Sequence, residues 1–171
     1  MNAQKFTQKS LEAIQSAQSI ALSHQNQQIE QVHLLAALLQ QEGGLIPQLL
    51  KKMGLTVESL DAAVNAEIDK LPAVTGSGRE ADKYYIARAV DTALNGAETL
   101  AESMKDDFVS VEHLFLALID HADPTLQRLF QTYQIKKEAV LQTLMNIRGN
   151  QRVTSDSPED TYEALEKYGT D

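Results

Sequence analysis

The chain has 171 residues, of which 43% are hydrophobic, and its 15 basic and 24 acidic side chains give a net charge of −9. This length allows one ordinary domain or two very small ones, with enough apolar residues to bury a core. The acidic balance argues against nucleic acid and anionic membranes as partners, because both select basic surfaces, and the absence of cysteine excludes disulfides and thiolate chemistry.

The opening stretch, MNAQKFTQKS, has no basic start followed by an apolar run, so it does not resemble a signal peptide. The longest apolar run, residues 34–39, is too short to cross a bilayer, and we therefore expect a cytoplasmic chain. Apolar residues at helical spacing, with caps and glycine stops, predict four helices in the first part of the chain. These helices are expected at residues 7–23, 31–41, 45–53 and from Thr56 to about 68.

Residues 71–82 contain the proline and glycines typical of a surface loop, and a second set of four helices is expected after it. Ser110 is expected to cap its second helix, with Glu112 in the first turn, where the helix dipole favours an anion. No segment shows the period-two alternation of a strand. The first of these helices is expected at about residues 84–104 and the fourth at about 136–148, while the third is expected to open at Asp123-Pro124.

A shift of 80 positions lays residues 6–68 over residues 86–148 without a gap, and ten of the 63 pairs are identical. The apolar positions also coincide, which indicates a duplicated unit. We therefore predict an all-α fold, an eight-helix bundle of two pseudo-symmetric four-helix repeats within a domain of residues 1–148. Residues 149–171 are polar and acidic, and are interpreted as a linker.

Few features of the sequence indicate catalysis. There is no Gly-Lys pair, so a P-loop is absent, and the four histidines do not have zinc-site spacing. His33 and His113 lie at equivalent helix starts and are interpreted as neutral structural residues. Asp106, Asp107 and Glu112 are interpreted as exposed acids that form a recognition patch rather than an acid–base pair. A hydrolase with a histidine–carboxylate site remains the alternative from a different functional class.

Two stretches repeat one phrase: VHLLAALLQ at residues 32–40 and EHLFLALID at residues 112–120. This phrase resembles the signature of the Clp N-terminal domain, which precedes the ATPase modules of class 1 Clp/Hsp100 unfoldases. The segments DDFVSVEHLFLAL and YEALEKYGTD also resemble this family, and QEGG, LPAVTGSG and ALEKYGTD are similar to the ClpB type, the protein disaggregases. The resemblance implies a double Clp N-terminal motif and a non-catalytic domain that captures unfolded or aggregated polypeptides.

The resemblance also implies the partners of the longer protein. These are a homohexamer that cooperates with a DnaK-type system, with ATP and magnesium bound in ATPase modules outside this chain. No cofactor is expected in the chain itself, which should be a monomer. Position by position, the resemblance carries the family's functional polar residues onto Thr7, Asp106 and Glu112. Candidates for an apolar groove between the halves are Phe6, Leu94 and Phe108.

A second reading follows from the same resemblance. Domains of the ClpC or ClpA type bind adaptors, and in the ClpC type a glutamate before the histidine in both copies is associated with phosphorylated arginine. Here Glu112 fits that pattern, whereas Val32 fills the first slot. The alternative to client capture is therefore a domain that binds adaptors or phosphoarginine-tagged proteins for degradation.

Overall fold

The computed structural model describes residues 2–74 and 85–149. Within these ranges the predicted all-α fold is confirmed, and each predicted helix is present with small shifts at its ends. Part of the predicted loop and nearly all of the predicted linker, residues 150–171, lie outside the described residues. A short 3-10 helix (Ala3–Lys5) precedes α1 (Gln8–Ser23), α2 (Gln31–Gln40), α3 (Leu45–Lys52), α4 (Val57–Asp69), α5 (Arg88–Ser103), α6 (Val111–Asp120), α7 (Pro124–Thr132) and α8 (Lys137–Arg148).

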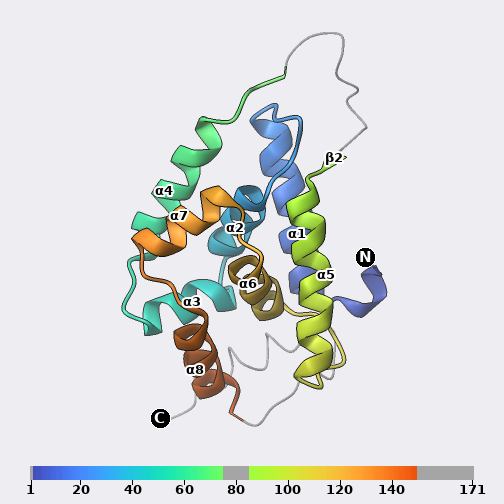
Figure 1. Cartoon of the computed structure of the whole chain (residues 1–171), viewed down its shortest axis with the longest axis vertical. Coiled ribbons are helices and arrows are strands. Elements are labelled where there is room, and N and C mark those ends of the chain that lie inside the picture. Colours follow the sequence, from blue (N-terminus) through green and yellow to red (C-terminus); the bar gives the residue numbers. More distant parts are fainter. Residues whose placement is uncertain (1, 75–84, 150–171) are drawn as a thin grey trace.

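Helices α2 and α6, which carry the repeated phrase, lie in the middle of the bundle (Figure 1). Each packs along the first helix of its own half, α1 or α5, and the two central helices also contact each other. Burial explains their composition, since Leu35, Leu38, Phe115 and Leu118 have no exposed surface. Each such side chain contributes about 2 kcal/mol through removal of apolar surface from water. The repeated phrase therefore forms the core of the domain.

Short extended segments of one half pair with segments of the other half, which was not predicted from the sequence. Strand β1 (Gln28–Ile29) pairs in parallel with β2 (Tyr85–Ile86), so the helix expected from residue 84 begins only at Arg88. A second parallel bridge joins Phe6 to Val109. Two-residue strands are too short to show period-two alternation, so they could not be recognised from the sequence.

These two bridges are related by the shift of 80 positions. Val109 corresponds to Ile29 and Ile86 corresponds to Phe6, so each half pairs the segment before its first helix with the segment before the other half's central helix. The backbone bonds match, since Thr7 N donates to the oxygen of Val109 at 2.9 Å and Ala87 N donates to the oxygen of Ile29 at 3.0 Å. The two repeats are thus interlocked rather than merely adjacent.

The turns after α1 and α5 have the same backbone geometry, which places one residue of each turn beside the central helices. Gln25 and Lys105 have positive φ angles of 56° and 60°. The next residue in each turn donates its backbone N–H back across the helix end, from Asn26 to Ala21 O and from Asp106 to Ala101 O, both at 2.9 Å. This is a helix-terminating Schellman arrangement. It leaves the side chains of Asn26 and Asp106 buried beside the central helices.

Candidate functional site

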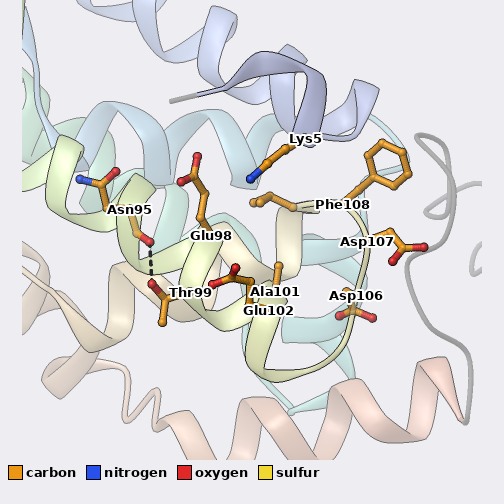
Figure 2. A pocket seen from close by; sticks show the side chains of 10 residues that line it. Lys5, Asn95, Glu98, Thr99, Ala101, Glu102, Asp106, Asp107 and Phe108 are labelled. Carbon is orange, nitrogen blue, oxygen red and sulfur yellow. Dashed lines mark hydrogen bonds between the residues drawn. The ribbon is translucent and has the colours of Figure 1, made fainter.

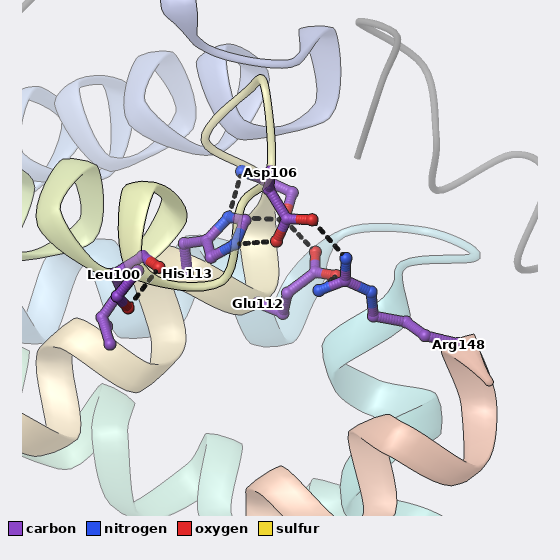
Figure 3. Close-up of polar contacts among 7 residues, drawn as sticks. Leu100, Asp106, Glu112, His113 and Arg148 are labelled. Carbon is purple, nitrogen blue, oxygen red and sulfur yellow. Dashed lines mark hydrogen bonds and ion pairs between the residues drawn. The ribbon is translucent and has the colours of Figure 1, made fainter. Parts of the chain in front are cut away.

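A buried cluster of charged groups lies where the α5–α6 turn meets the end of α8 (Figure 3). Arg148 Nη2 donates to Asp106 Oδ1 at 2.6 Å, and Arg148 Nη1 lies 3.6 Å from Glu112 Oε2. The three side chains are between 0% and 6% exposed. Water therefore contributes little to the solvation of these charges, and the ion pairs must do so instead.

His113 also belongs to this cluster, and its hydrogen bonds show which of its ring nitrogens carries the proton. Its Nδ1 accepts a hydrogen bond from Ser110 N at 2.9 Å, so Nε2 carries the proton and donates to Asp106 Oδ2 at 2.8 Å. Ser110 Oγ in turn donates to a carboxylate oxygen of Glu112. The "charge network" of Asp106, Glu112, His113 and Arg148 therefore holds two acidic side chains, one guanidinium and one imidazole.

The first half has the same histidine geometry without the charges. His33 Nδ1 accepts from Glu30 N at 2.8 Å and its Nε2 donates to Asn26 Oδ1 at 2.8 Å. Burial, followed by the nearby charge of His24, lowers the pKa of His33 to about 4. A neutral imidazole suits this place, since the Glu30 N–H already points at Nδ1. This confirms that His33 is a neutral structural residue.

The shift of 80 positions shows how the halves differ. The buried first-half positions Asn26, Val32 and Ile68 correspond to Asp106, Glu112 and Arg148. The second half thus places three charged groups where the first half places an amide and two hydrocarbon side chains. The halves share a scaffold, and this point of it is charged only in the second half.

His113 contacts Ser110 through one ring nitrogen and Asp106 through the other, as the histidine of a serine–histidine–aspartate triad does in hydrolases. However, Ser110 and His113 are fully buried, and Ser110 Oγ already donates to Glu112. The first half repeats the histidine contacts with Glu30 and Asn26 in place of the serine and the aspartate. This geometry is that of a helix cap rather than a nucleophile, so it lends the hydrolase alternative no support. The described residues also contain no group of three potential metal ligands.

Beside the charge network lies an open cleft of about 310 Å³ (Figure 2). One wall is the exposed side of α5, with Glu98 and Glu102, and another is the α5–α6 turn, with Asp107 and Phe108. Lys5 reaches over from the N-terminal 3-10 helix. The remaining lining residues are Asn95, Thr99, Ala101, Asp106 and Val109. The cleft thus combines several carboxylates with one half-buried aromatic ring.

The acidity of the cleft also belongs to the second half alone. Glu98, Glu102 and Asp107 correspond to residues without charge under the shift of 80 positions, namely Gln18, Leu22 and Gln27. Lys5 likewise corresponds to Tyr85. The pseudo-symmetric position therefore offers no matching set of carboxylates, and the two ends of the domain are chemically distinct.

Three of the six predicted site residues lie at or against this cleft. Asp106 and Phe108 line it, and Phe6 is buried behind it through its bridge to Val109. Phe108 is half-buried, which leaves part of its ring accessible. Asp106 is a correction, because the sequence predicted an exposed acid and the turn geometry buries its side chain completely.

The other three predicted site residues are buried. Thr7 caps α1, where its Oγ1 accepts from Ser10 N at 3.2 Å. Leu94 lies in the core on α5. Glu112 is only 1% exposed, which corrects the prediction of an exposed acid, and it belongs to the charge network. Their role in binding stays a prediction, and any such role would act through the shape of the site or a rearrangement.

Two residues that matter here were missed by the sequence analysis. Arg148 was interpreted only as a helix end, although the shift of 80 positions lays it over the buried Ile68. Gln31 is fully buried at the junction of the halves. Its Nε2 donates to the oxygens of Ala89 and His121 at 2.9 and 2.8 Å, and its Oε1 accepts from Asp123 N at 2.8 Å. The available signal was the same for both residues, because the shift of 80 positions lays Arg148 over Ile68 and Gln31 over Val111, each a polar residue against an apolar one.

Relatives of the chain point to one family. The model of the Clp repeat (R) N-terminal domain matches residues 5–156. Chaperone protein ClpB of Bacillus anthracis is 47% identical over 171 residues, which are all of this chain and 20% of that protein. ClpB of Nitratidesulfovibrio vulgaris is 41% identical, again with 20% of that protein covered. The chain thus spans about a fifth of the length of these relatives.

Solved structures agree on the fold. The Hsp104 N-terminal domain from Candida albicans superposes with a TM-score of 0.75 at 22% identity, covering 91% of this chain and 99% of that one. A complex of the ClpV N-domain with a VipB peptide gives 0.63 at 21% identity, covering 91% and 90%. In the described part of the chain, no helix combines the length and apolar character needed to cross a membrane. With a family model that matches most of its residues, the chain belongs to the Clp repeat N-terminal domain family.

Proposed function

We propose that this chain is the client-binding N-terminal domain of a ClpB-type disaggregase. It captures unfolded or aggregated polypeptide segments and delivers them to an ATPase ring in the same protein. The proposal is supported by the whole-chain similarity to ClpB proteins and by the acidic cleft of the second half. The domain itself is non-catalytic, and residues 149–171 act as the linker to the ATPase modules.

The observation that carries the proposal is the combination of groups around the cleft. Phe108 offers a partly accessible aromatic side chain, while Glu98, Glu102 and Asp107 add negative charge to the lining of the same cleft. Unfolded chains expose apolar side chains with little regard to sequence, and a shallow apolar contact binds them without specific readout. Carboxylates at the rim favour segments that carry lysine or arginine beside the apolar residue.

The small cleft and the exposure of its carboxylates favour weak binding. At about 310 Å³ the cleft accommodates one or two side chains of a client rather than a folded element. Exposed carboxylates contribute only weakly and are screened by salt. Such binding suits a transfer step, because a tightly held client would not leave for the next site.

The larger assembly is part of the same proposal. The full-length protein is a homohexamer that takes ATP and magnesium in modules outside this chain and works with a DnaK-type chaperone system. The domain is a monomer on a linker in the cytoplasm, without nucleic-acid or membrane partners. A linker of about twenty residues keeps the domain near the ring and raises the local concentration of captured segments.

The alternative of a phosphoarginine or adaptor receptor finds less support. Glu112, the residue that suggested it, is buried against Arg148 and accepts from Ser110. A guanidinium ligand would have to displace the chain's own guanidinium there. The equivalent position in the first half is Val32, which cannot bind a cation.

Short fluorescent peptides test the proposal on the 171-residue chain. One peptide alternates leucine with arginine, and two matched peptides replace the arginines with glutamine or with glutamate. Anisotropy titrations should show binding in the order arginine, glutamine, glutamate, with the first weakened by salt. Equal affinity for all three, or none for any, overturns the proposal. Saturable binding of free phosphoarginine in the same assay favours the alternative.

A further inference from the structure

The four-helix unit can form without the charge network. The first half builds the same four-helix unit with Asn26, Val32 and Ile68 at the equivalent positions. Replacement of buried ion pairs by packed apolar groups is often neutral or stabilising. The second half therefore carries three buried charges that its architecture does not require, and a role beyond stability can be sought for them.

The position of the charge network suggests that role. Asp106 belongs to the α5–α6 turn, whose next two residues, Asp107 and Phe108, line the cleft. Its carboxylate divides its two oxygens between α6, through His113, and the last residue of α8, Arg148 (Figure 3). One residue of the cleft wall therefore forms an ion pair with the last residue of α8. The first-half counterparts of this pair are Asn26 and Ile68, which cannot form one.

We propose that Arg148 is a positioning residue that couples the cleft to the C-terminal end of α8. The coupling rests on the client-binding function proposed above. A client that moves or orders the turn at residues 106–109 changes the contact between Asp106 and Arg148, and the last turn of α8 responds. The relation is reciprocal, so the state of α8 also changes the affinity of the cleft.

The buried setting makes this link directional and stiff. A planar guanidinium between Asp106 and Glu112 constrains both position and angle, which an ammonium group does not. The surrounding low polarity strengthens the ion pair and makes partial separation costly. Motion at either end is therefore transmitted as a rearrangement of the pair and is not absorbed by solvent.

The test compares three altered chains with the unaltered one. Arg148→Lys keeps the charge and removes the fork. The triple variant Asp106→Asn, Glu112→Val, Arg148→Ile gives the second half the first half's residues, and should fold with little change in melting temperature. Lys137→Met is the matched control, because Lys137 forms another α6–α8 ion pair, with Asp120 at 2.9 Å.

Hydrogen exchange with and without the leucine–arginine peptide is the main readout. In the unaltered chain and in Lys137→Met, the peptide should slow exchange both at residues 106–109 and at residues 145–149. In Arg148→Lys and the triple variant the second effect should vanish, and the peptide should bind about five-fold more weakly. Slowing confined to the cleft in the unaltered chain, or undiminished at α8 in the variants, overturns the coupling.

A second readout needs no peptide, so failure of the proposed function stays distinguishable. Amide chemical shifts of Asp107 and Phe108 should change in Arg148→Lys and stay unchanged in Lys137→Met. If no peptide binds, the client-binding proposal fails, and these shifts alone decide the coupling. Equal shifts in the two variants then contradict it.

Discussion

The guanidinium of Arg148 lies 2.6 Å from the carboxylate of Asp106, and the two side chains are only 6% and 0% exposed. This ion pair joins the α5–α6 turn, which forms one wall of the cleft, to the last residue of α8. A buried pair of this kind costs about as much to desolvate as it returns in attraction. Its consequences therefore differ according to whether one partner is removed or the whole network.

Removal of the guanidinium alone should be strongly destabilising. Arg148→Met leaves Asp106 and Glu112 buried without their cation, for which we expect a loss of about 3–5 kcal/mol in the free energy of unfolding. Urea denaturation followed by circular dichroism measures this. The triple variant with Asn, Val and Ile at positions 106, 112 and 148 should lie within about 1 kcal/mol of the unaltered chain, as expected for a neutral replacement. Equal stability of Arg148→Met and the unaltered chain would contradict this picture.

The architecture could be predicted from the sequence because periodicity and duplication are strong local signals. The repeated phrase predicted the buried helices α2 and α6, and glycine, proline and cap residues marked most helix ends within a residue or two. The strand pairing between the halves could not be predicted, because two-residue strands have no pattern of their own. It depends on how the halves meet, which local sequence does not encode.

The site was harder to predict for a related reason. Asp106 and Glu112 were identified through the family resemblance, but as exposed acids, since a charged residue in a turn is usually solvated. Their burial depends on a cation 36 residues or more away along the chain, Arg148, which is a long-range pairing. The acidic residues of α5, Glu98 and Glu102, resembled an ordinary solvated helix face until the turn closed a cleft beside them.

His33 should make stability depend on pH. Its pKa is about 4 in the folded chain and 6.5 in its ordinary state, so the unfolded chain takes up a proton first as pH falls. The contribution of His33 is fully present above about pH 6.5 and is lost as pH falls toward about 4. We expect a loss of up to about 3 kcal/mol across this window. Urea denaturation at a series of pH values measures it.

His33→Gln is the control for this effect. Glutamine and glutamate are the usual residues at this position of a capping box, so a glutamine oxygen can accept from the Glu30 N–H while its amide nitrogen donates to Asn26. The variant should fold, and its stability should fall less steeply than that of the unaltered chain between pH 6.5 and 4. Parallel curves would show that another group causes the pH dependence.

Gln31 should contribute to the junction of the halves. Gln31→Val copies Val111, its counterpart in the second half, and removes three hydrogen bonds to Ala89, His121 and Asp123. We expect a loss of about 1–3 kcal/mol in the free energy of unfolding, because partly buried backbone groups lose their partners. Thermal unfolding followed by calorimetry measures the change. A matched replacement of an exposed glutamine, Gln15→Val, should cost much less, and equal costs would deny Gln31 this role.

The last prediction concerns the charge of the cleft. Glu98→Gln together with Glu102→Gln removes two carboxylates from its wall without a large change in shape. Affinity for the leucine–arginine peptide should fall roughly three- to ten-fold at low salt, and the loss should shrink as salt is raised. The control is Glu58→Gln with Glu138→Gln, which removes two exposed carboxylates from the equivalent first turns of α4 and α8. Since both double variants have the same net charge, a loss of affinity confined to the first assigns binding to the cleft, whereas an equal loss in both would reduce the effect to overall charge.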